Sequence, residues 1–360
     1  MRKLRTALMF VAGTFIAVCA CVAPPPVAAR HSSIPDKLSD RDFWALTESV
    51  SEPDGTFFSD NFLSNERGYQ AVIPELLSTA KSGGVYLGVG PEQNFPYIVA
   101  LKPSLAIIFD IRRGNLHEHL LYKALMELSA DRADFLSRLF SRPRPAGLTA
   151  QTPVRDMMVA YSGVAPDEKL FSATLTAVTD LLTHTHGFAL HAGDAPGIEY
   201  VFHKAFFDGG PMLTMNTNAP LGRRCCDDNG TYGDIQSLND GTGLNRGFLG
   251  SEANWQTLKS YETRNLIIPV VGDFAGPHAI RAAGQYLRDH DAVVSAFYLS
   301  NVEDWLNRAG HEQIFLCNAN ALPLDASSVF IFTGQGRFGG YPGTLNVTRL
   351  RPIRPDTGGC

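Results

Sequence analysis

Residues 84–111 read GVYLGVGPEQNFPYIVALKPSLAIIFDI and predict a strand, a helix and a second strand in succession. The two ends of this stretch, 84–90 and 104–111, are short apolar runs rich in β-branched residues and without polar alternation. That pattern is typical of strands buried in a parallel sheet. Between them, Pro91 predicts the start of a helix, since proline is favoured in a first helical turn. Leucines on one face of 115–129 predict a second helix, so the order is strand, helix, strand, helix.

The same alternation returns after residue 264. Five apolar strands separated by helices predict an α/β fold, a doubly wound parallel sheet with strand order 3-2-1-4-5 and helices on both faces. The three later strands are expected at 266–271 (LIIPVV), 292–299 (AVVSAFYL) and 328–333 (SVFIFT).

The long interval between the second and third strands predicts an inserted cap. Residues 131–264 mix helical patterns with Pro- and Gly-rich stretches, and an insertion there would lie at the carboxyl edge of the sheet, where such folds bind ligands. The chain is therefore divided into 1–30 (signal peptide and Pro-rich tether), 31–82 (helices and loops), 83–130 (first half of the Rossmann-like domain), 131–264 (cap), 265–335 (second half) and 336–360 (C-terminal tail).

The amino-terminal residues predict export. Met1–Arg5 is basic and 6–20 is an apolar run of about 15 residues, as in a signal peptide and shorter than the roughly 20 residues of a membrane span. The sequence Val18-Cys19-Ala20-Cys21 resembles a bacterial lipobox, so Cys21 is a candidate lipid anchor. We expect a periplasmic protein or a membrane-anchored lipoprotein. The alternative is a cytoplasmic protein whose leader is not processed.

Charge and cysteine content exclude two classes of protein. The formal net charge of −5 argues against a nucleic-acid binder that neutralises phosphates. The expected partner is a small-molecule ligand, with membrane contact only through Cys21. Six cysteines in 360 residues match neither a disulfide framework nor a zinc motif, although the vicinal pair Cys225-Cys226 with Asp227 and Asp228 could bind a soft metal.

The turn after the first strand predicts nucleoside binding. Gly88 and Gly90 let the backbone approach a ligand, and the helix that follows offers unpaired N–H groups beside Glu92 and Asn94. Asp110 ends the next strand about 20 residues later, where a carboxylate can accept both hydroxyls of a ribose. The other interpretation is a tight sheet-edge turn and a helix cap.

These residues resemble the class I S-adenosylmethionine-dependent methyltransferases. The runs GVGPEQNFPYI, IFDIRRGN, VVGDFAGP and FYLSNVEDWL are similar to an uncharacterised bacterial family described as methyltransferase-like. The resemblance covers about 85–130 and 245–335.

The resemblance implies S-adenosylmethionine as the cofactor and assigns roles to single residues. Gly88 and Gly90 would face the methionine part, Asp110 the ribose and Asp273 the adenine. Asn301, at the end of the fourth strand, would lie near the transferred methyl, and Asn301 or Glu303 would touch the acceptor.

A second hypothesis is a non-catalytic exported protein that binds a nucleoside or another small molecule on the same scaffold. Tyr86 replaces the acid usual before the glycine loop, and Glu92 replaces the usual third glycine. Export would also separate the protein from S-adenosylmethionine, a cytoplasmic metabolite.

A remote third hypothesis is a metal-dependent hydrolase that uses histidines of the cap. An H-x-H pair in an extended segment would place both imidazoles on one face, and further ligands could complete a zinc shell. Because the spacing matches no hydrolase motif, no metal ligand is assigned. The residues concerned are His184, His186, His191, Asp194 and His203.

The run Gly334-Gln335-Gly336-Arg337-Phe338-Gly339 matches G-x-G-x-x-G in letters only. Gly340 and Pro342 follow it, so no helix is expected, and the dinucleotide-binding unit cannot form.

Overall fold

The computed structural model describes residues 32–64, 66–215, 230–336, 345–354 and 360. The expected signal peptide, tether and lipid anchor in 1–31 lie outside these ranges, as do Cys225 and Cys226. The region from Ser32 onward forms one compact unit. Within the described ranges, every helix is too short or too polar to span a lipid bilayer.

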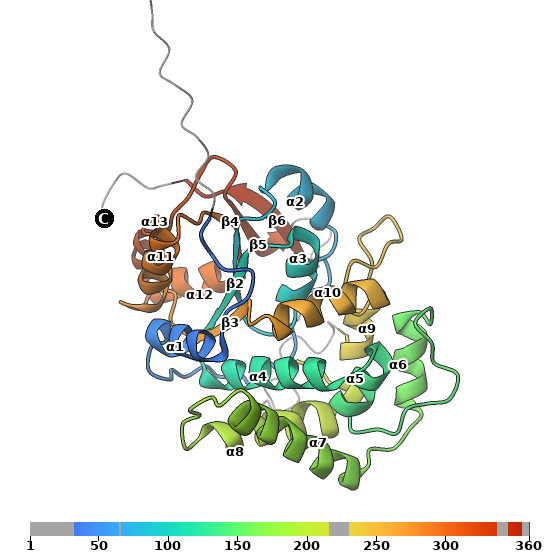
Figure 1. Ribbon diagram of the computed structural model, residues 1–360. Helices are drawn as coiled ribbons and strands as arrows, with labels where there is room; N and C mark the ends of the chain where they lie inside the picture. The colour runs from blue at the N-terminus through green and yellow to red at the C-terminus, as the bar shows by residue number, and fades with distance from the viewer. Residues whose placement is uncertain (1–31, 65, 216–229, 337–344, 355–359) are drawn as a thin grey trace, which may run out of the picture. The chain divides into compact units, whose positions relative to one another are not determined.

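A six-stranded, mostly parallel sheet forms the centre of this unit (Figure 1). The strand order is β3-β2-β1-β4-β5-β6, and among these described strands only β6, at the edge, runs antiparallel to its neighbour. The α/β class is therefore confirmed. The strands are β1 (Val85–Val89), β2 (Leu105–Asp110), β3 (Ile267–Val271), β4 (Val294–Ser300), β5 (Val329–Gly336) and β6 (Leu345–Pro352).

The central strands are buried on both faces, as their continuous apolar runs predict. All six residues of β2 are buried, and β2 pairs in register with β1 through Val85 and Leu105 and with β3 through Ala106 and Ile267. Parallel strands whose two faces are both covered need apolar side chains at every position.

The carboxyl-terminal prediction is wrong in one respect. Residues 345–352, assigned to a tail, form β6 and pair with β5 along its whole length. Gly334 and Gly336 lie within β5 rather than in a phosphate-binding turn, as expected from the missing helix signal.

Helices cover both faces of the sheet, as Figure 1 shows. On one side, α3 packs on β1 and α4 packs on β2 and β3, with α10 against α3 and α4. On the other side, α12 packs on β4, α11 contacts α13, and α1 lies against β3 and α11. These helices and α2 are α1 (Asp40–Val50), α2 (Ile73–Thr79), α3 (Asn94–Leu101), α4 (Arg113–Leu128), α10 (Glu252–Thr263), α11 (Ala279–Asp289), α12 (Val302–Ala309) and α13 (Glu312–Asn320).

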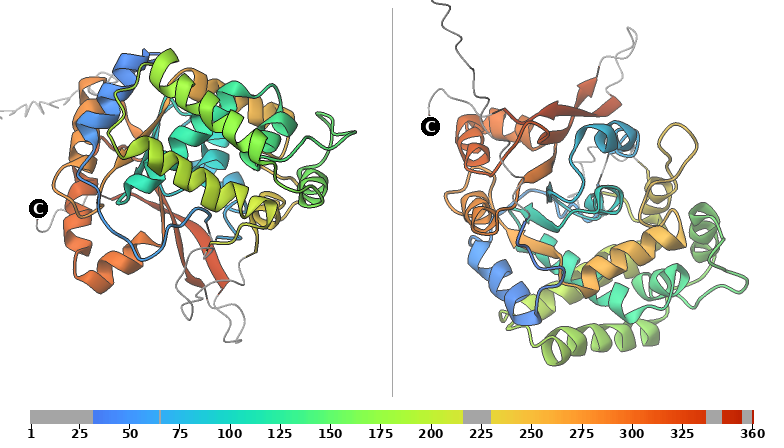
Figure 2. Two further views of the ribbon diagram at one scale, coloured as in Figure 1. Left: turned by 90° about the horizontal axis from the view of Figure 1, so that it is seen from below. Right: turned by 45° about the horizontal axis from the view of Figure 1, so that its top comes forward.

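The region between α4 and α10 adds an outer helical layer. Figures 1 and 2 both show α7 and α8 beside α4, on the side away from the sheet. Two of the helices end in short π-helical turns, η1 and η2. The elements are α5 (Arg132–Leu139), α6 (Val154–Ser162), α7 (Glu168–Asp180), η1 (Leu181–Thr185), α8 (Asp194–Val201), η2 (Phe202–Phe207), η3 (Gly210–Met212) and α9 (Tyr232–Gln236).

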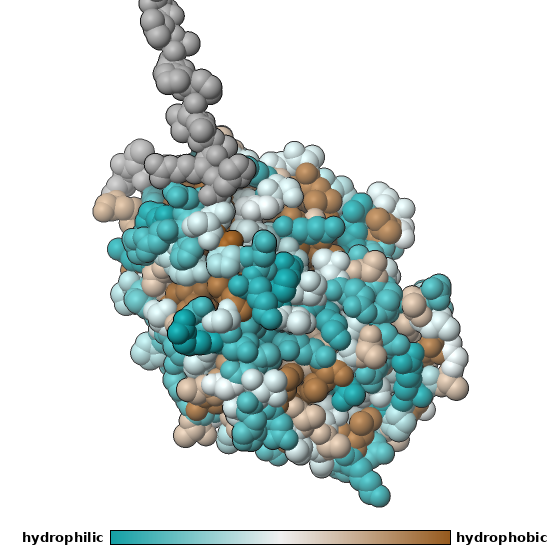
Figure 3. Space-filling view, in the orientation of Figure 1, coloured by the Kyte–Doolittle hydropathy of each residue, from teal (hydrophilic) through white to brown (hydrophobic). Residues whose placement is uncertain are grey.

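The surface in Figure 3 is mostly hydrophilic, with separate small hydrophobic patches. Such scattered apolar residues are ordinary for a folded domain.

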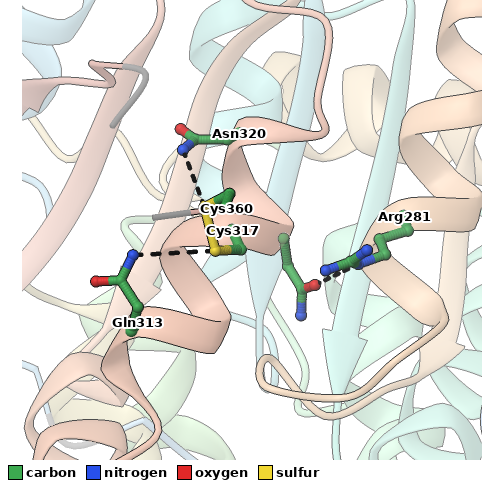
Figure 4. The surroundings of a disulfide bond; sticks show 6 residues. Arg281, Gln313, Cys317, Asn320 and Cys360 are labelled. Atoms are coloured by element: carbon green, nitrogen blue, oxygen red, sulfur yellow. Dashed lines mark hydrogen bonds between the residues drawn. A yellow bond between two sulfur atoms is a disulfide. The ribbon is translucent and has the colours of Figure 1, made fainter. Parts of the chain in front are cut away.

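A disulfide joins α13 to the last residue, which the cysteine spacing did not predict. Cys317 and Cys360 are bonded across 43 residues of sequence (Figure 4). Asn320 donates a hydrogen bond to Cys360 Sγ, and Gln313 donates one to Cys317 Sγ. The bond closes a loop that contains β5 and β6, so it ties the antiparallel edge of the sheet to α13.

We expect Cys317→Ser to lower the free energy of unfolding by about 2 kcal/mol, because the disulfide restricts the unfolded chain. Urea unfolding of the oxidised protein measures the change. Cys360→Ser should give the same loss, and the double variant should lose no more than either single variant. Equal unfolding midpoints with and without reductant would contradict a structural role for the bond.

Candidate functional site

A cavity of about 390 Å³ lies at the carboxyl ends of β1 to β4. Four predicted residues line it: Gly90 after β1, Asp110 at the end of β2, Asp273 after β3 and Asn301 after β4. They are far apart in sequence, but parallel strands bring their carboxyl ends to one edge of the sheet. The cavity is lined by Phe57, Phe58, Asn61, Leu63, Ser64, Val89, Gly90, Pro91, Asp110, Ile111, Arg112, Met215, Asp273, Phe274, Tyr298, Ser300, Asn301, Val302, Trp305, Leu306, Ala309 and His311.

The two glycines of the loop have different roles. Gly90 has a φ of +76°, and a Cβ built on it would meet no atom within 4 Å, so this glycine leaves room for a ligand. Gly88 does not line the cavity. A Cβ on Gly88 would lie 1.8 Å from Asn94 Oδ1, so glycine is required there to admit the Asn94 side chain.

Asn94 holds the loop together from behind. Its Nδ2 donates to the carbonyl oxygens of Val89, Gly90 and Pro91 at 3.0, 3.1 and 2.7 Å, and Tyr86 donates its hydroxyl hydrogen to Asn94 Oδ1. Asn94 is fully buried and lies outside the cavity lining. Asn94, predicted to bind the cofactor, instead stabilises the loop through these hydrogen bonds, and Tyr86 holds the Asn94 side chain in place.

A buried histidine supports the same loop. His119 Nε2 lies 2.9 Å from the Gly90 carbonyl oxygen. Burial lowers the pKa of His119 to about 4, so the ring is neutral at pH 7 and its Nε2–H donates to this carbonyl. His119 fixes the orientation of the peptide group that carries Gly90.

Asp110 reaches the cavity as half of an ion pair. Arg112 donates from Nη2 to Asp110 Oδ2 at 2.8 Å and from Nε to Oδ1 at 2.9 Å, and its backbone N–H also donates to Oδ1. Both side chains are about nine-tenths buried. A ribose at this place would therefore have to share the carboxylate with Arg112.

Asp273 differs from Asp110 in having no cationic partner among the described residues. Its Oδ1 accepts the Ala275 N–H at 2.9 Å, and its own backbone N–H donates to Glu52 Oε2. The Glu52 carboxylate also accepts the N–H groups of His278 and Ala279 at the start of α11. This loop presents Asp273 to the cavity as an acceptor.

The sequence predicted that Glu92 lies in the first turn of the helix that begins at Pro91. This is wrong, because α3 begins at Asn94. Glu92 is buried and lies outside the cavity lining. Burial raises its pKa to about 8, and Gln236 of α9 donates a long hydrogen bond of 3.4 Å to its carboxyl group. Glu92 is therefore a buried neutral acid at pH 7, behind the loop.

Of the two residues assigned to the acceptor, the structure brings only one to the cavity. Asn301 lines it, immediately before α12. Glu303 is absent from the lining and forms an ion pair with Arg351 of β6. Trp305, one helical turn after Asn301, lines the cavity instead.

An aromatic cluster, Phe57, Phe58 and Trp305, also lines the cavity. The ring centroids of Phe57 and Phe58 each lie 5.4 Å from that of Trp305. Phe58 remains 49% exposed and Trp305 38% exposed, so these rings are not fully packed by the chain itself.

A buried carboxyl group, that of Glu66, lies behind the cavity wall, and no sequence pattern indicated it. Ser300 donates a hydrogen bond to Glu66 Oε1, although the two residues are 234 positions apart. Burial raises the pKa of Glu66, and the hydrogen bond from Ser300 opposes this effect. Ser300 has a φ of +51°, a strained value for a residue with a side chain.

The cap histidines pair with separate carboxylates. His186 lies between Asp40 and Glu127 at 2.9 and 3.0 Å, and His191 is 2.7 Å from Glu48. His184 pairs with Asp180 and His203 with Asp208. In the described part of the chain, no three such side chains gather as metal ligands.

Asp194 anchors the cap to α4. It accepts two hydrogen bonds from Arg113, at 2.6 and 2.8 Å, and lies 2.8 Å from His117 Nε2. Burial opposes ionisation of Asp194, but these hydrogen bonds and that of His191 hold its pKa well below the usual range. The group is a structural ion pair between α8 and α4.

A family model covers both halves of the sheet. It matches residues 61–148 and 233–347, so the interval between the matches falls within the predicted cap. These ranges contain Gly90, Asp110, Asp273 and Asn301. No curated protein matches the sequence. Since the matches span more than half of the chain, the protein belongs to the family described as "Domain of unknown function (DUF7790)".

Proposed function

We propose that the chain binds S-adenosylmethionine in the cavity at the ends of β1 to β4 and acts as a methyltransferase on a second ligand. One observation carries the proposal: Gly90, Asp110, Asp273 and Asn301 line a single cavity of about 390 Å³. This volume lies in the range of small-molecule sites, about 300 to 1,000 Å³. The strand order β3-β2-β1-β4-β5 supports the same proposal.

The residues present fit this cofactor in two places. Gly90 leaves its Cα open to the cavity, which suits close approach of a ligand to the backbone. The Asp273 carboxylate can accept hydrogen bonds from a nucleoside. When bound, S-adenosylmethionine supplies an electrophilic methyl group. The contribution of the chain would be to exclude water and to hold the two ligands in line, which can supply much of a rate enhancement.

We expect Asp273→Asn to weaken binding of S-adenosylmethionine by about 10- to 150-fold, because hydrogen bonds to a charged acceptor contribute about 1.5 to 3 kcal/mol. Calorimetric titration of the full chain with S-adenosylmethionine and with S-adenosylhomocysteine measures the effect. Asp156→Asn is a matched control, since Asp156 is exposed on α6, away from the cavity.

Stoichiometric binding to the wild type, weakened only by Asp273→Asn, would support the cofactor assignment. Absence of heat with millimolar cofactor would contradict it. Equal affinities for the two Asn variants would contradict the role of Asp273 in particular.

The Asp110–Arg112 ion pair favours a second candidate function, a non-catalytic protein that binds a small molecule. The pair occupies the carboxylate that would otherwise hold a ribose. On this alternative the cavity keeps its position at the sheet edge but takes a different ligand, since a fold alone does not determine a function.

We also propose that the protein is exported. The Cys317–Cys360 disulfide supports this, because such bonds persist mainly in oxidising compartments. Lipid attachment at Cys21 and a periplasmic location remain part of the same proposal. The described residues give no support to a hydrolase that uses the cap histidines.

A further inference from the structure

Three hydroxyl groups on the cavity wall have their hydrogen-bond partners behind the wall. The hydroxyl-bearing residues are Ser64, Tyr298 and Ser300. Their partners are the side chains of Gln93 and Glu66, which are only 2% and 1% exposed. The direction of each hydrogen bond decides what this wall can offer to a ligand.

The Gln93 amide fixes the direction for two of the hydroxyls. Gln93 Nε2 donates to the backbone carbonyl of Glu66 at 2.8 Å, and a carbonyl oxygen can only accept. Gln93 Oε1 therefore faces Ser64 and Tyr298 and accepts from both, at 2.7 Å in the case of Tyr298. Both hydroxyl hydrogens are directed toward Gln93, so only oxygen lone pairs remain for the cavity.

Glu66 has the same effect on Ser300. Ser300 donates its hydroxyl hydrogen to Glu66 Oε1, and Glu66 Oε2 has no partner among the described residues. The positive φ of Ser300 at the end of β4 is maintained at a cost, which is typical of a residue held in place for function. The hydroxyl wall therefore presents three acceptors.

The aromatic cluster defines the other requirement of the same cavity. Phe57, Phe58 and Trp305 together offer a large apolar surface to the cavity. Phe58 is 49% exposed and Trp305 is 38% exposed. Burying aromatic surface is favourable, and stacked or edge-to-face rings add to this. A flat apolar ligand would gain this energy.

We propose that the cavity binds a flat apolar ring bearing a hydroxyl group, with the ring against the aromatic cluster and the hydroxyl donating to Ser300 Oγ. The inference rests on the proposed function in one respect: this ligand would be the methyl acceptor. In this reaction the acceptor oxygen would form a bond to the methyl carbon while the bond from that carbon to the sulfonium sulfur breaks and leaves its electron pair on sulfur. The oxygen would keep the electrons of its O–H bond. Its proton passes to Ser300 Oγ, and the proton of Ser300 passes to the Glu66 carboxylate, which becomes neutral. Glu66 is thus a positioning residue.

The test compares 2-naphthol with 2-methoxynaphthalene, in which a methyl group replaces the hydroxyl hydrogen and removes the hydrogen-bond donor. Both are titrated into the full chain without S-adenosylmethionine, so the result is independent of the proposed cofactor. We expect the wild type to bind 2-naphthol about tenfold more tightly, the worth of one hydrogen bond. Ser300→Ala should remove this preference. Ser172→Ala, on the exposed face of α7, should keep it.

Glu66→Gln is a second variant that preserves side-chain shape, and it should reduce the preference at least threefold because the amide can donate to Ser300 instead of accepting. Circular dichroism melts confirm that each variant is folded. The proposal is overturned if neither probe binds, if the wild type shows no preference, or if the preference survives in both Ser300→Ala and Glu66→Gln. Binding of 2-naphthol with no binding of S-adenosylmethionine would contradict the proposed methyltransferase function and still support the proposed site for a hydroxyl-bearing ring.

Discussion

Asp110→Ala is expected to lower the free energy of unfolding by about 3 to 5 kcal/mol, because it leaves the Arg112 guanidinium buried without its carboxylate. The Arg112 side chain is 11% exposed and donates two hydrogen bonds to Asp110, and the Arg112 backbone N–H donates a third. From sequence alone, Asp110 was expected to serve a ligand, and no pattern predicted an ion pair with Arg112. The ion pair changes that expectation.

Urea unfolding of Asp110→Ala, Arg112→Ala and the double variant measures the coupling between the two side chains. The double variant should be more stable than the sum of the two single losses predicts. Asp208→Ala is the matched control, since Asp208 forms a half-exposed pair with Lys204 that should be worth at most about 1 kcal/mol. Additive losses would contradict the coupling.

Arg112→Ala also separates the two proposed functions. Removing the guanidinium frees the Asp110 carboxylate, so a nucleoside that uses Asp110 should bind more tightly to this variant. Unchanged affinity would make the ion pair purely structural and favour the non-catalytic binding protein.

The strands could be predicted because burial on both faces leaves a direct mark on the sequence. The run at 104–111 contains β2, observed at Leu105–Asp110. β6 was missed because an antiparallel edge strand carries polar residues among its apolar ones, as in LNVTRLRP at 345–352. Such a pattern is easily taken for a tail.

Part of the cavity was predictable for the same reason. Residues that follow parallel strands meet at one edge, so Gly90, Asp110, Asp273 and Asn301 could be expected together. The contacts that each of these side chains makes could not be predicted from the sequence. Arg112 lies two residues from Asp110, yet no pattern states that their side chains pair.

Contacts between distant residues left no local signal at all. The Ser300–Glu66 hydrogen bond joins the end of β4 to a loop before α2, and each residue alone is an ordinary polar residue. The Cys317–Cys360 bond likewise depends on how α13 lies relative to the end of the chain. Only three-dimensional structure could bring these groups together.

Glu92→Gln is expected to stabilise the protein near pH 8 by on the order of 3 kcal/mol while leaving its stability near pH 4 unchanged. Burial raises the pKa of Glu92 from about 4.5 to about 8, so the folded protein holds this proton more tightly than the unfolded chain does. The stability that comes from this proton is complete below pH 4.5 and is lost as the pH rises toward 8. Glutamine has no proton to lose, so the difference grows across that interval.

Urea unfolding of the wild type and Glu92→Gln at several pH values between 4 and 8.5 measures this difference. Glu75→Gln on the exposed face of α2 is the matched control and should track the wild type at every pH. Because Glu92 lies outside the cavity lining, Glu92→Gln should also leave ligand affinity unchanged. A stability difference that does not vary with pH would mean that Glu92 is ionised in the folded protein. In that case a cation or solvent must reach the interior behind the glycine loop. Glu92 would then again be a candidate binding-site residue.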